Sequence, residues 1–211
     1  MIELQNVTKE IHGEQVLSRV SLTLEDGKIY GFVGQNGSGK TMLFRAICGL
    51  IHLTEGEVRI DGQPVDFQHM PKSVGLLLEA PAFLGNLTGV QNLKMLSYLT
   101  PGITDERIRD MLKQVGLTKA MDKRYGKYSL GMKQRLGLAY AFLSDPKIIL
   151  LDEPTNALDA RGIEILIEMI HEYHDRGATI LIASHDGAFL SSITANMISM
   201  EKGCVTGIRL E

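Results

Sequence analysis

The eight residues from Gly34 to Thr41 constrain the fold of this chain more than any other stretch. They read Gly-Gln-Asn-Gly-Ser-Gly-Lys-Thr, a pattern in which two glycines, a lysine and a threonine stand at fixed spacing. The preceding run Ile29–Val33 is short and apolar, as expected of a buried strand in a parallel sheet, and a helix is expected from Thr41. A strand, a glycine-rich loop and a helix in this order predict an α/β fold whose loop binds a nucleotide by its phosphates.

Each residue type in this loop suits phosphate binding. Glycines lack a Cβ, so the backbone can fold with successive N–H groups pointing at phosphate oxygens, and the following helix adds its positive end. Lys40 is expected to place its ammonium against the β- and γ-phosphates, and Thr41 to complete the shell of a bridging Mg²⁺. The expected nucleotide-binding residues of the loop are Gly34, Gln35, Asn36, Gly37, Ser38, Gly39, Lys40 and Thr41.

A second apolar run, Ile148–Leu151, ends in two acids, Asp152 and Glu153. In an open α/β sheet, ligands collect at the carboxyl ends of the strands, so both acids are expected to face the nucleotide. Asp152 is the candidate Mg²⁺ ligand because a hard cation prefers oxygen donors. Glu153 is the candidate general base, since a carboxylate beside the γ-phosphate can orient and deprotonate an attacking water.

The rest of the chain divides into strand-rich and helical parts. Alternating apolar residues and turns predict antiparallel hairpins near the N-terminus, while helical spacing predominates between about Leu87 and Leu143. A buried strand, an amphipathic helix and another buried strand, Thr179–Ala183, then form a βαβ unit, and a hairpin closes the chain. We therefore expect a single domain over 1–211, with a core and β subdomain at about 1–86 and 144–211 and a helical subdomain at about 87–143.

Several further motifs stand in an order that resembles the nucleotide-binding domain of ATP-binding cassette (ABC) transporters over essentially the whole chain. Tyr128–Arg135 resembles the family's signature motif, Pro154–Asp159 its D-loop, and Ala183–Asp186 its switch-histidine segment. The resemblance implies a P-loop NTPase core with a mostly parallel sheet, an N-terminal antiparallel β subdomain and a helical signature subdomain. It also implies ATP hydrolysis, with His185 sensing the γ-phosphate.

The signature segment implies a second anion site. Ser129 and Gly131 precede an amphipathic helix, so they present a hydroxyl and free N–H groups at a positive helix end. From the residues alone, an ordinary N-cap serine is the simpler interpretation. The resemblance implies instead that this site serves ATP bound to a partner subunit, in a head-to-tail homodimer that sandwiches two ATP molecules, with Asp159 contacting the partner.

The sequence departs from the family pattern in three motifs. Leu130 and Met132 replace the usual glycine and glutamine of the signature, and Glu79 stands where the Q-loop glutamine, a Mg²⁺-side residue, is expected. Ile11 stands where the family has the aromatic residue that stacks on adenine, so His12 beside it, or an aliphatic contact by Ile11, would have to serve. Glu79 is shared with the bacitracin- and lantibiotic-type export and self-protection branch, which Leu78–Phe83, Asn86–Gly89 and Asn92-Leu93 also resemble.

Composition and net charge limit the classes of partner that this chain can bind. The chain has 211 residues and a formal net charge of −3, which gives no basic footprint for a nucleic acid backbone. Its apolar runs are far shorter than the ~20 residues that cross a bilayer, and its two cysteines show no metal spacing. The resemblance then implies a cytoplasmic homodimer held at the inner face of the membrane by a separate permease subunit. The candidate permease contacts are Phe83, Leu84 and Leu87, and ordinary core or loop packing is an equally good interpretation of these side chains.

Other functions remain open at this point. One is a soluble ABC-type ATPase in translation or repair, although such proteins usually carry two cassettes or a long coiled-coil insert. Another is a regulatory module that binds ATP without turnover, which the altered signature favours and the intact Lys40, Asp152, Glu153 and His185 disfavour. A small-molecule kinase is disfavoured by the paired acids. The transported substrate is not encoded in these motifs, and export of a peptide antibiotic or drug follows only from the resemblance to the branch.

Overall fold

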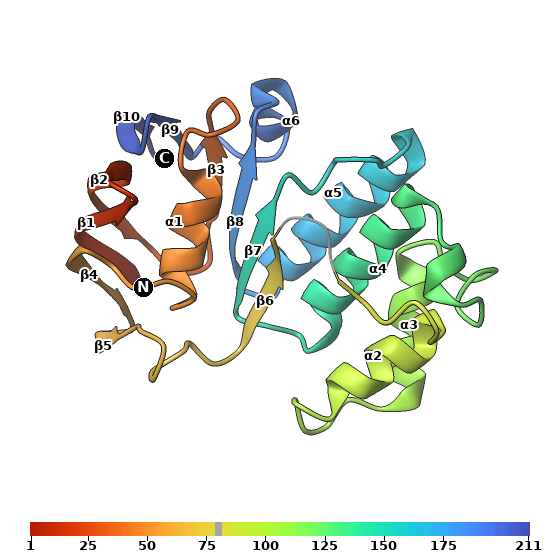
Figure 1. The fold of residues 1–211 in the computed structure, drawn as a ribbon. Helices are drawn as coiled ribbons and strands as arrows, with labels where there is room; N and C mark the ends of the chain where they lie inside the picture. Colours follow the sequence, from red (N-terminus) through yellow and green to blue (C-terminus); the bar gives the residue numbers. More distant parts are fainter. Residues whose placement is uncertain (79–81) are drawn as a thin grey trace.

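A computed structural model describes residues 1–78 and 82–211, and Glu79–Pro81 lie outside the described residues. The chain forms two β-sheets, with helices between them and on the far side of the larger sheet (Figure 1). The predicted fold class, an α/β core with a mostly parallel sheet, an antiparallel N-terminal sheet and a helical part, is confirmed.

The larger sheet has six strands in the order β10-β9-β3-β8-β7-β6, all parallel except the β9–β10 hairpin. Both of its faces are buried because its strands carry apolar residues at successive positions. In β7, Ile149 and Leu151 pack toward α4 and α5, whereas Ile148 and Leu150 pack toward α1. The strands are β3 (Ile29–Val33), β6 (Val74–Leu77), β7 (Ile148–Asp152), β8 (Thr179–Ser184), β9 (Met197–Glu201) and β10 (Cys204–Arg209).

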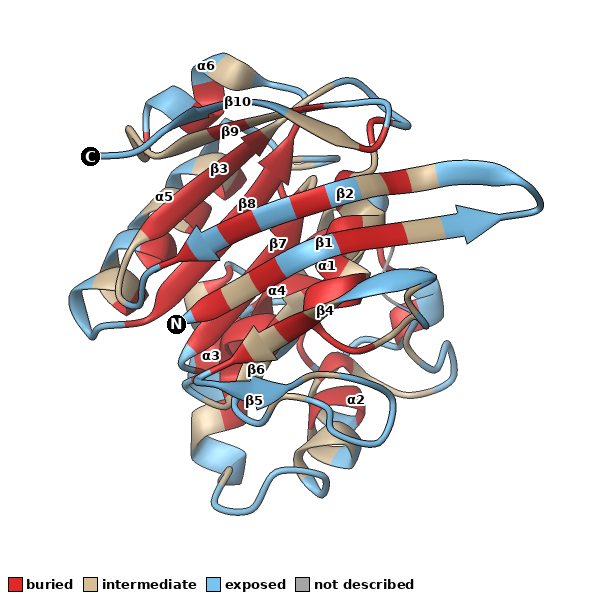
Figure 2. Cartoon of the chain, turned by 90° about the vertical axis from the view of Figure 1, so that its left-hand side faces the viewer, coloured by how far each residue is buried: buried red, intermediate tan, exposed pale blue. Residues whose placement is uncertain are grey.

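The smaller sheet is antiparallel in the order β2-β1-β4-β5. Its strands alternate buried and exposed residues (Figure 2), and the buried set packs against α1 (Lys40–Ile47), whose apolar face includes Leu43 and Phe44. The helix that follows the glycine-rich loop is therefore clamped between the two sheets. The strands are β1 (Ile2–Ile11), β2 (Glu14–Leu24), β4 (Glu55–Ile60) and β5 (Gln63–Pro64).

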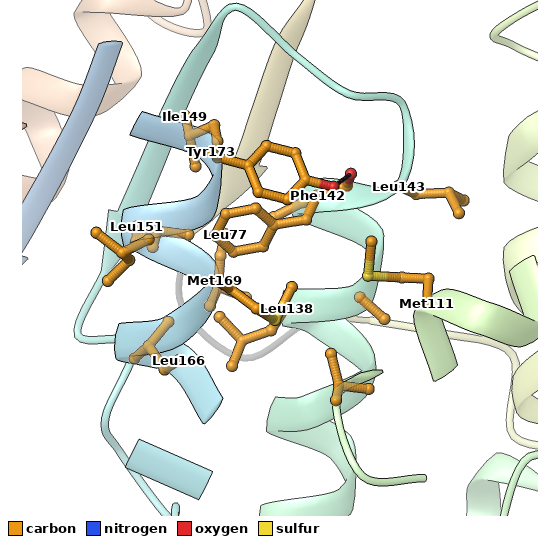
Figure 3. Close-up of a cluster of buried hydrophobic side chains, with 14 of the residues drawn as sticks. Leu77, Met111, Leu138, Phe142, Leu143, Ile149, Leu151, Leu166, Met169 and Tyr173 are labelled. Carbon is orange, nitrogen blue, oxygen red and sulfur yellow. Dashed lines mark hydrogen bonds between the residues drawn. The ribbon is translucent and has the colours of Figure 1, made fainter. Parts of the chain in front are cut away.

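Helices cover the opposite face of the larger sheet. Their common core with β6 and β7 is shown in Figure 3, where Phe142 and Tyr173 meet edge to face with ring centroids 4.8 Å apart. The buried Tyr173 hydroxyl donates to the Phe142 carbonyl oxygen at 2.7 Å, so its polar end is satisfied. The helices are α2 (Gly89–Ser97), α3 (Asp105–Gln114), α4 (Leu130–Leu143), α5 (Ala160–Asp175) and α6 (Gly187–Ser191), with a 3-10 turn, η1, at Tyr125–Lys127.

The first strand is longer than its sequence suggests. Polar residues follow Val7, but β1 continues to Ile11. Its end pairs with β2 through backbone hydrogen bonds, which need no apolar side chains, and Asn6 takes a positive φ of 50° where the register shifts.

Among residues 1–78 and 82–211, no helix has the length and apolar character needed to cross a bilayer.

Candidate functional site

The glycine-rich loop connects β3 to α1 as its sequence predicts, and glycines are required where it turns. Gly37 and Gly39 have φ angles of 80° and 102°, which side-chain-bearing residues rarely adopt. A Cβ on Gly39 would lie 2.9 Å from the Val16 carbonyl oxygen, and one on Gly34 would lie 2.6 Å from Ser38 Oγ. The loop is thus packed tightly against the start of β2 and against itself.

Lys40 points into this loop. Its side chain is only 5% exposed, and its ammonium donates to the carbonyl oxygens of Gly34 at 2.6 Å and Gln35 at 3.1 Å. Ser38 Oγ is also buried and has no hydrogen-bond partner in the described part of the chain, whereas Gln35, Asn36 and Gly37 are exposed. A buried cation, an unpartnered hydroxyl and a glycine cradle at the start of a helix fit a polyphosphate.

Two of the three candidate metal ligands lie side by side. Thr41, on the first turn of α1, donates from Oγ1 to Asp152 Oδ2 at 2.5 Å, and Asp152 is the buried last residue of β7. A hydroxyl and a carboxylate are the oxygen donors that suit Mg²⁺ beside phosphates. Within 1–78 and 82–211 there is no cluster of three or more His, Cys, Asp or Glu side chains that could hold a metal. The third candidate, Glu79, lies outside the described residues.

Glu153, His185 and Lys40 converge at the carboxyl ends of β7 and β8. The Glu153 carboxylate accepts from the backbone N–H of His185 at 3.0 Å, and its other oxygen lies 2.9 Å from His185 Nδ1. The Lys40 ammonium is 3.9 Å from the same carboxylate. Glu153 has a positive φ of 46°, a strained conformation that is held by its own N–H, which donates to the Ala183 carbonyl oxygen at 2.8 Å.

The signature residues lie elsewhere on the molecule. Ser129 is the N-cap of α4, where its Oγ accepts from the Met132 N–H at 3.3 Å, and it is exposed. α4 packs on one face of the larger sheet and α1 on the other. Among the described residues, no hydrogen bond or ion pair joins Ser129 or Gly131 to the phosphate loop. The departing residue Leu130 is 69% exposed, so it is not a core residue.

Asp159 caps α5 and pairs with a residue of the signature helix. Its Oδ1 accepts from the Gly162 N–H at 2.9 Å and from Arg135 Nη2 at 2.5 Å. The Gly162 hydrogen bond first, and then the Arg135 guanidinium, lower the pKa of this carboxyl. Arg135 ends the signature segment, and no local pattern in the sequence pairs it with Asp159.

Ile11 ends β1 at the tip of the first hairpin, opposite Glu14, and is 37% exposed. In the described part of the chain, none of the hydrogen bonds or ion pairs joins it to the phosphate loop. The same hairpin reaches the loop further along β2, at Val16, whose carbonyl oxygen lies beside Gly39 and Gly203. An aliphatic adenine contact by Ile11 therefore stays a prediction.

Of the three candidate permease contacts, Phe83 lines a cavity of about 590 Å³ between β6, α2 and α4. The Phe83 ring also packs against Tyr125 at 5.4 Å, which makes it part of the core. Leu84 is 48% exposed, and Leu87 is half-buried. Exposed apolar side chains continue along α2 and the turn after it, at Met95, Tyr98 and Leu99.

Comparisons with family models and with known protein sequences point to the same family. The family described as "ABC transporter" matches residues 17–156. An uncharacterized ABC transporter ATP-binding protein, YybJ of Bacillus subtilis (strain 168), is 43% identical over 96% of this chain and 94% of its own. The bacitracin transport ATP-binding protein BcrA of Enterococcus faecalis is 39% identical over 88% of this chain and 61% of its own. The lantibiotic transport ATP-binding protein SrtF of Streptococcus pyogenes is 35% identical over 88% and 80%.

One solved structure is also informative. It is the dimeric post-hydrolysis state of the ATP-binding cassette MJ0796 bound to ADP and Pi. It matches with a TM-score of 0.90 and 26% identity, over 100% of this chain and 99% of that one.

Proposed function

Because the chain belongs to the ABC transporter family and is an ATP-binding, ATP-hydrolysing subunit, we propose that it works as a homodimer that powers a separate membrane permease. The convergence of Lys40, Glu153 and His185 at one edge of the sheet carries the hydrolysis step of this proposal, and the dimeric MJ0796 structure and the transport ATP-binding relatives support the dimer and the permease. The three side chains supply a phosphate-binding cation, a carboxylate base and a ring that holds the base.

The loop residues bind and orient the nucleotide in this proposal. The N–H groups of residues 35–39 and the start of α1 surround the phosphates, and Lys40 exchanges its contacts with Gly34 and Gln35 for β- and γ-phosphate oxygens. Thr41 and Asp152 would hold Mg²⁺, and Glu79 is the third proposed ligand. When bound, Mg²⁺ neutralises charge that develops between the β- and γ-phosphates.

Glu153 is proposed to take the proton of the attacking water as the water oxygen bonds to the γ-phosphorus and the bond to the β-phosphate oxygen breaks. Two contacts from His185 fix the carboxylate for this task. Because His185 is exposed next to the base, it can also reach a γ-phosphate oxygen. The positive φ of Glu153 supports this role, because strained residues concentrate at functional sites.

A partner subunit completes each site in this proposal. Ser129 and Gly131 start α4 far from the phosphate loop of their own chain, and Ser129 is exposed. They are therefore free to meet ATP on a second copy, with Asp159 beside them. The dimeric arrangement of MJ0796 with ADP and Pi supports this arrangement for a chain of the same fold.

The 590 Å³ cavity and its rim are the proposed docking surface for a permease helix. Phe83 lines this cavity, and the exposed Leu84 beside it in the chain adds an apolar side chain that a permease helix could contact. The subunit would then lie on the cytoplasmic face of the membrane. Relatives named for bacitracin and lantibiotic transport support export of a peptide antibiotic or drug as the process that it powers.

Two experiments test the proposal. Lys40→Ala should abolish ATP turnover, whereas Lys28→Ala, a half-buried surface lysine paired with Glu25, should stay within about twofold of the original rate. Affinity capture from membranes should recover a polytopic membrane protein. Recovery of ribosomes or DNA in its place would overturn the transporter assignment in favour of a soluble ATPase.

A further inference from the structure

Arg135 joins three elements that the proposed dimer uses. It lies in the second turn of α4, and its side chain is 14% exposed. Nη1 donates to the carbonyl oxygen of Val115, which ends α3, at 2.9 Å. Nη2 donates to Asp159 Oδ1, the N-cap of α5, at 2.5 Å. One guanidinium therefore connects the signature helix α4 both to the end of α3 and to the last residue of the D-loop.

Two glycines make room for this guanidinium. A Cβ on Gly116 would lie 2.6 Å from Arg135 Nη1, and a Cβ on Gly162 would lie 3.0 Å from Nη2. Gly116 also has a φ of 78°, which any other residue rarely adopts. The planar fork of an arginine can satisfy both acceptors from this slot, whereas a lysine has one ammonium and can reach only one of them well.

The same end of α4 touches the D-loop at two further points. Gln134, which is buried, donates from Nε2 to the Pro154 carbonyl oxygen at 3.1 Å. A Cβ on Gly131 would lie 2.7 Å from the Ala157 carbonyl oxygen, so the two backbones are in close contact. The start of α4 and residues 154–159 are thus held together by contacts at three successive places.

We propose that Arg135 is a positioning residue for the partner subunit's ATP. It fixes Asp159 relative to Ser129 and Gly131, so that the signature and the D-loop of one chain meet the second copy as a single preformed surface. This inference rests on the proposed ATP-sandwich homodimer. It predicts that the effect of losing Arg135 falls on the site of the other subunit and not on the phosphate loop of its own chain.

A purely structural role makes a different prediction. The Asp159 side chain is 72% exposed, and ion pairs with exposed partners contribute little to folding stability. If Arg135 merely stabilised its own chain, every dimer carrying the substitution would be impaired to the same degree. The two cases are separated by placing Arg135→Ala either on the same copy as a disabled phosphate loop or on the other copy of the dimer.

The test uses two copies of the full chain joined by a flexible Gly/Ser linker, assayed for ATP hydrolysis at low protein concentration so that the linked copies pair with each other. In the trans arrangement, one copy carries Lys40→Ala and the other Arg135→Ala, which leaves one composite site with an intact loop and an intact facing surface. In the cis arrangement, one copy carries both substitutions and the other none, so the only intact loop faces the altered surface.

The trans protein should hydrolyse ATP about tenfold faster than the cis protein, the factor for losing one hydrogen bond to a charged group. Arg135→Lys, which keeps one of the two bonds, should narrow the gap. Asp159→Asn keeps the N-cap acceptor but loses the charge, and should reproduce the gap in part. Arg161→Ala, which removes a more exposed arginine–glutamate pair on the first turn of α5, should give equal cis and trans rates.

Equal cis and trans rates for Arg135→Ala would overturn the inference. A parallel pair with Ser129→Arg distinguishes this from failure of the dimer itself. A cis–trans gap for Ser129 without one for Arg135 leaves the ATP sandwich in place and removes the role of Arg135. Equal rates for both would contradict the sandwich, and the inference with it.

Discussion

Asn92 offers a quantitative test of how residues 82–88, the loop that carries Leu84, are held in front of α2. Its side chain is fully buried at the start of α2, and its amide makes three hydrogen bonds to backbone groups of the preceding loop. It accepts from the Leu84 N–H at 2.8 Å and donates to the carbonyl oxygens of Leu84 at 3.1 Å and Thr88 at 2.9 Å. We expect Asn92→Ala to release this loop.

The magnitude follows from these contacts. Each hydrogen bond contributes about 1 kcal/mol, which gives ~3 kcal/mol for the set. The better helix propensity of alanine returns ~0.5 kcal/mol, so the free energy of unfolding should fall by roughly 2–3 kcal/mol. For a domain of this size, that corresponds to a midpoint of thermal unfolding lowered by about 4–12 °C.

Circular dichroism during heating and urea titration measures this change. Asn86→Ala is the matched control, because Asn86 belongs to the same loop but is exposed, and it should change stability by less than ~0.5 kcal/mol. A loss below ~1 kcal/mol for Asn92→Ala, or equal losses for the two variants, would refute the view that the buried amide holds the loop.

Three further results are expected. Burial raises the pKa of the Cys48 thiol to about 12. At pH 8 a thiol reagent should therefore label the half-buried Cys204 in the native protein but reach Cys48 only on unfolding. Rapid labelling of both cysteines in the native protein would contradict this. Leu84→Asp should reduce recovery of the permease in affinity capture, whereas Asn86→Asp should not. Chelation of divalent cations should stop turnover, and readdition of Mg²⁺ should restore it, since the oxygens of Thr41 and Asp152 are proposed to hold the metal beside the phosphates.

The glycine-rich loop and the strands that flank the site are predictable from sequence for a physical reason. Strands β3 and β7 are continuous apolar runs, and such runs are typical of parallel strands that are buried on both faces. The polar residues that end them, including Asp152, then lie at the same edge of the sheet. The sequence therefore predicts which carboxylates and which lysine share one site.

Contacts between separate elements were not predictable in the same way. Gln134 and Arg135 are recognisable as signature residues, but their partners Pro154 and Asp159 follow a different strand, and no local pattern pairs them. The helix α6 is short, with only five residues, and is set mainly by the Asp186 cap. A five-residue segment shows too little periodicity to predict a helix.

The positive φ of Glu153 also arises from contacts between separate elements. Glutamate has no preference for this conformation, so nothing in the sequence signals it. It arises because the chain must leave β7 while its N–H still donates to Ala183 in β8 and its carboxylate meets His185. Tertiary contacts impose the strain, and only the folded chain reveals it.

In the proposed cycle, two copies close around ATP, and Glu153 then acts as the base for hydrolysis. Glu153→Gln keeps the shape of the side chain but removes the base, so ATP with Mg²⁺ should convert the 23.3 kDa monomer to a stable dimer of twice that mass. Size-exclusion chromatography with light scattering measures the mass directly, with Lys40→Ala in the same background as the control that stays monomeric. A Glu153→Gln protein that remains monomeric with ATP, or that hydrolyses ATP at the original rate, would contradict the account.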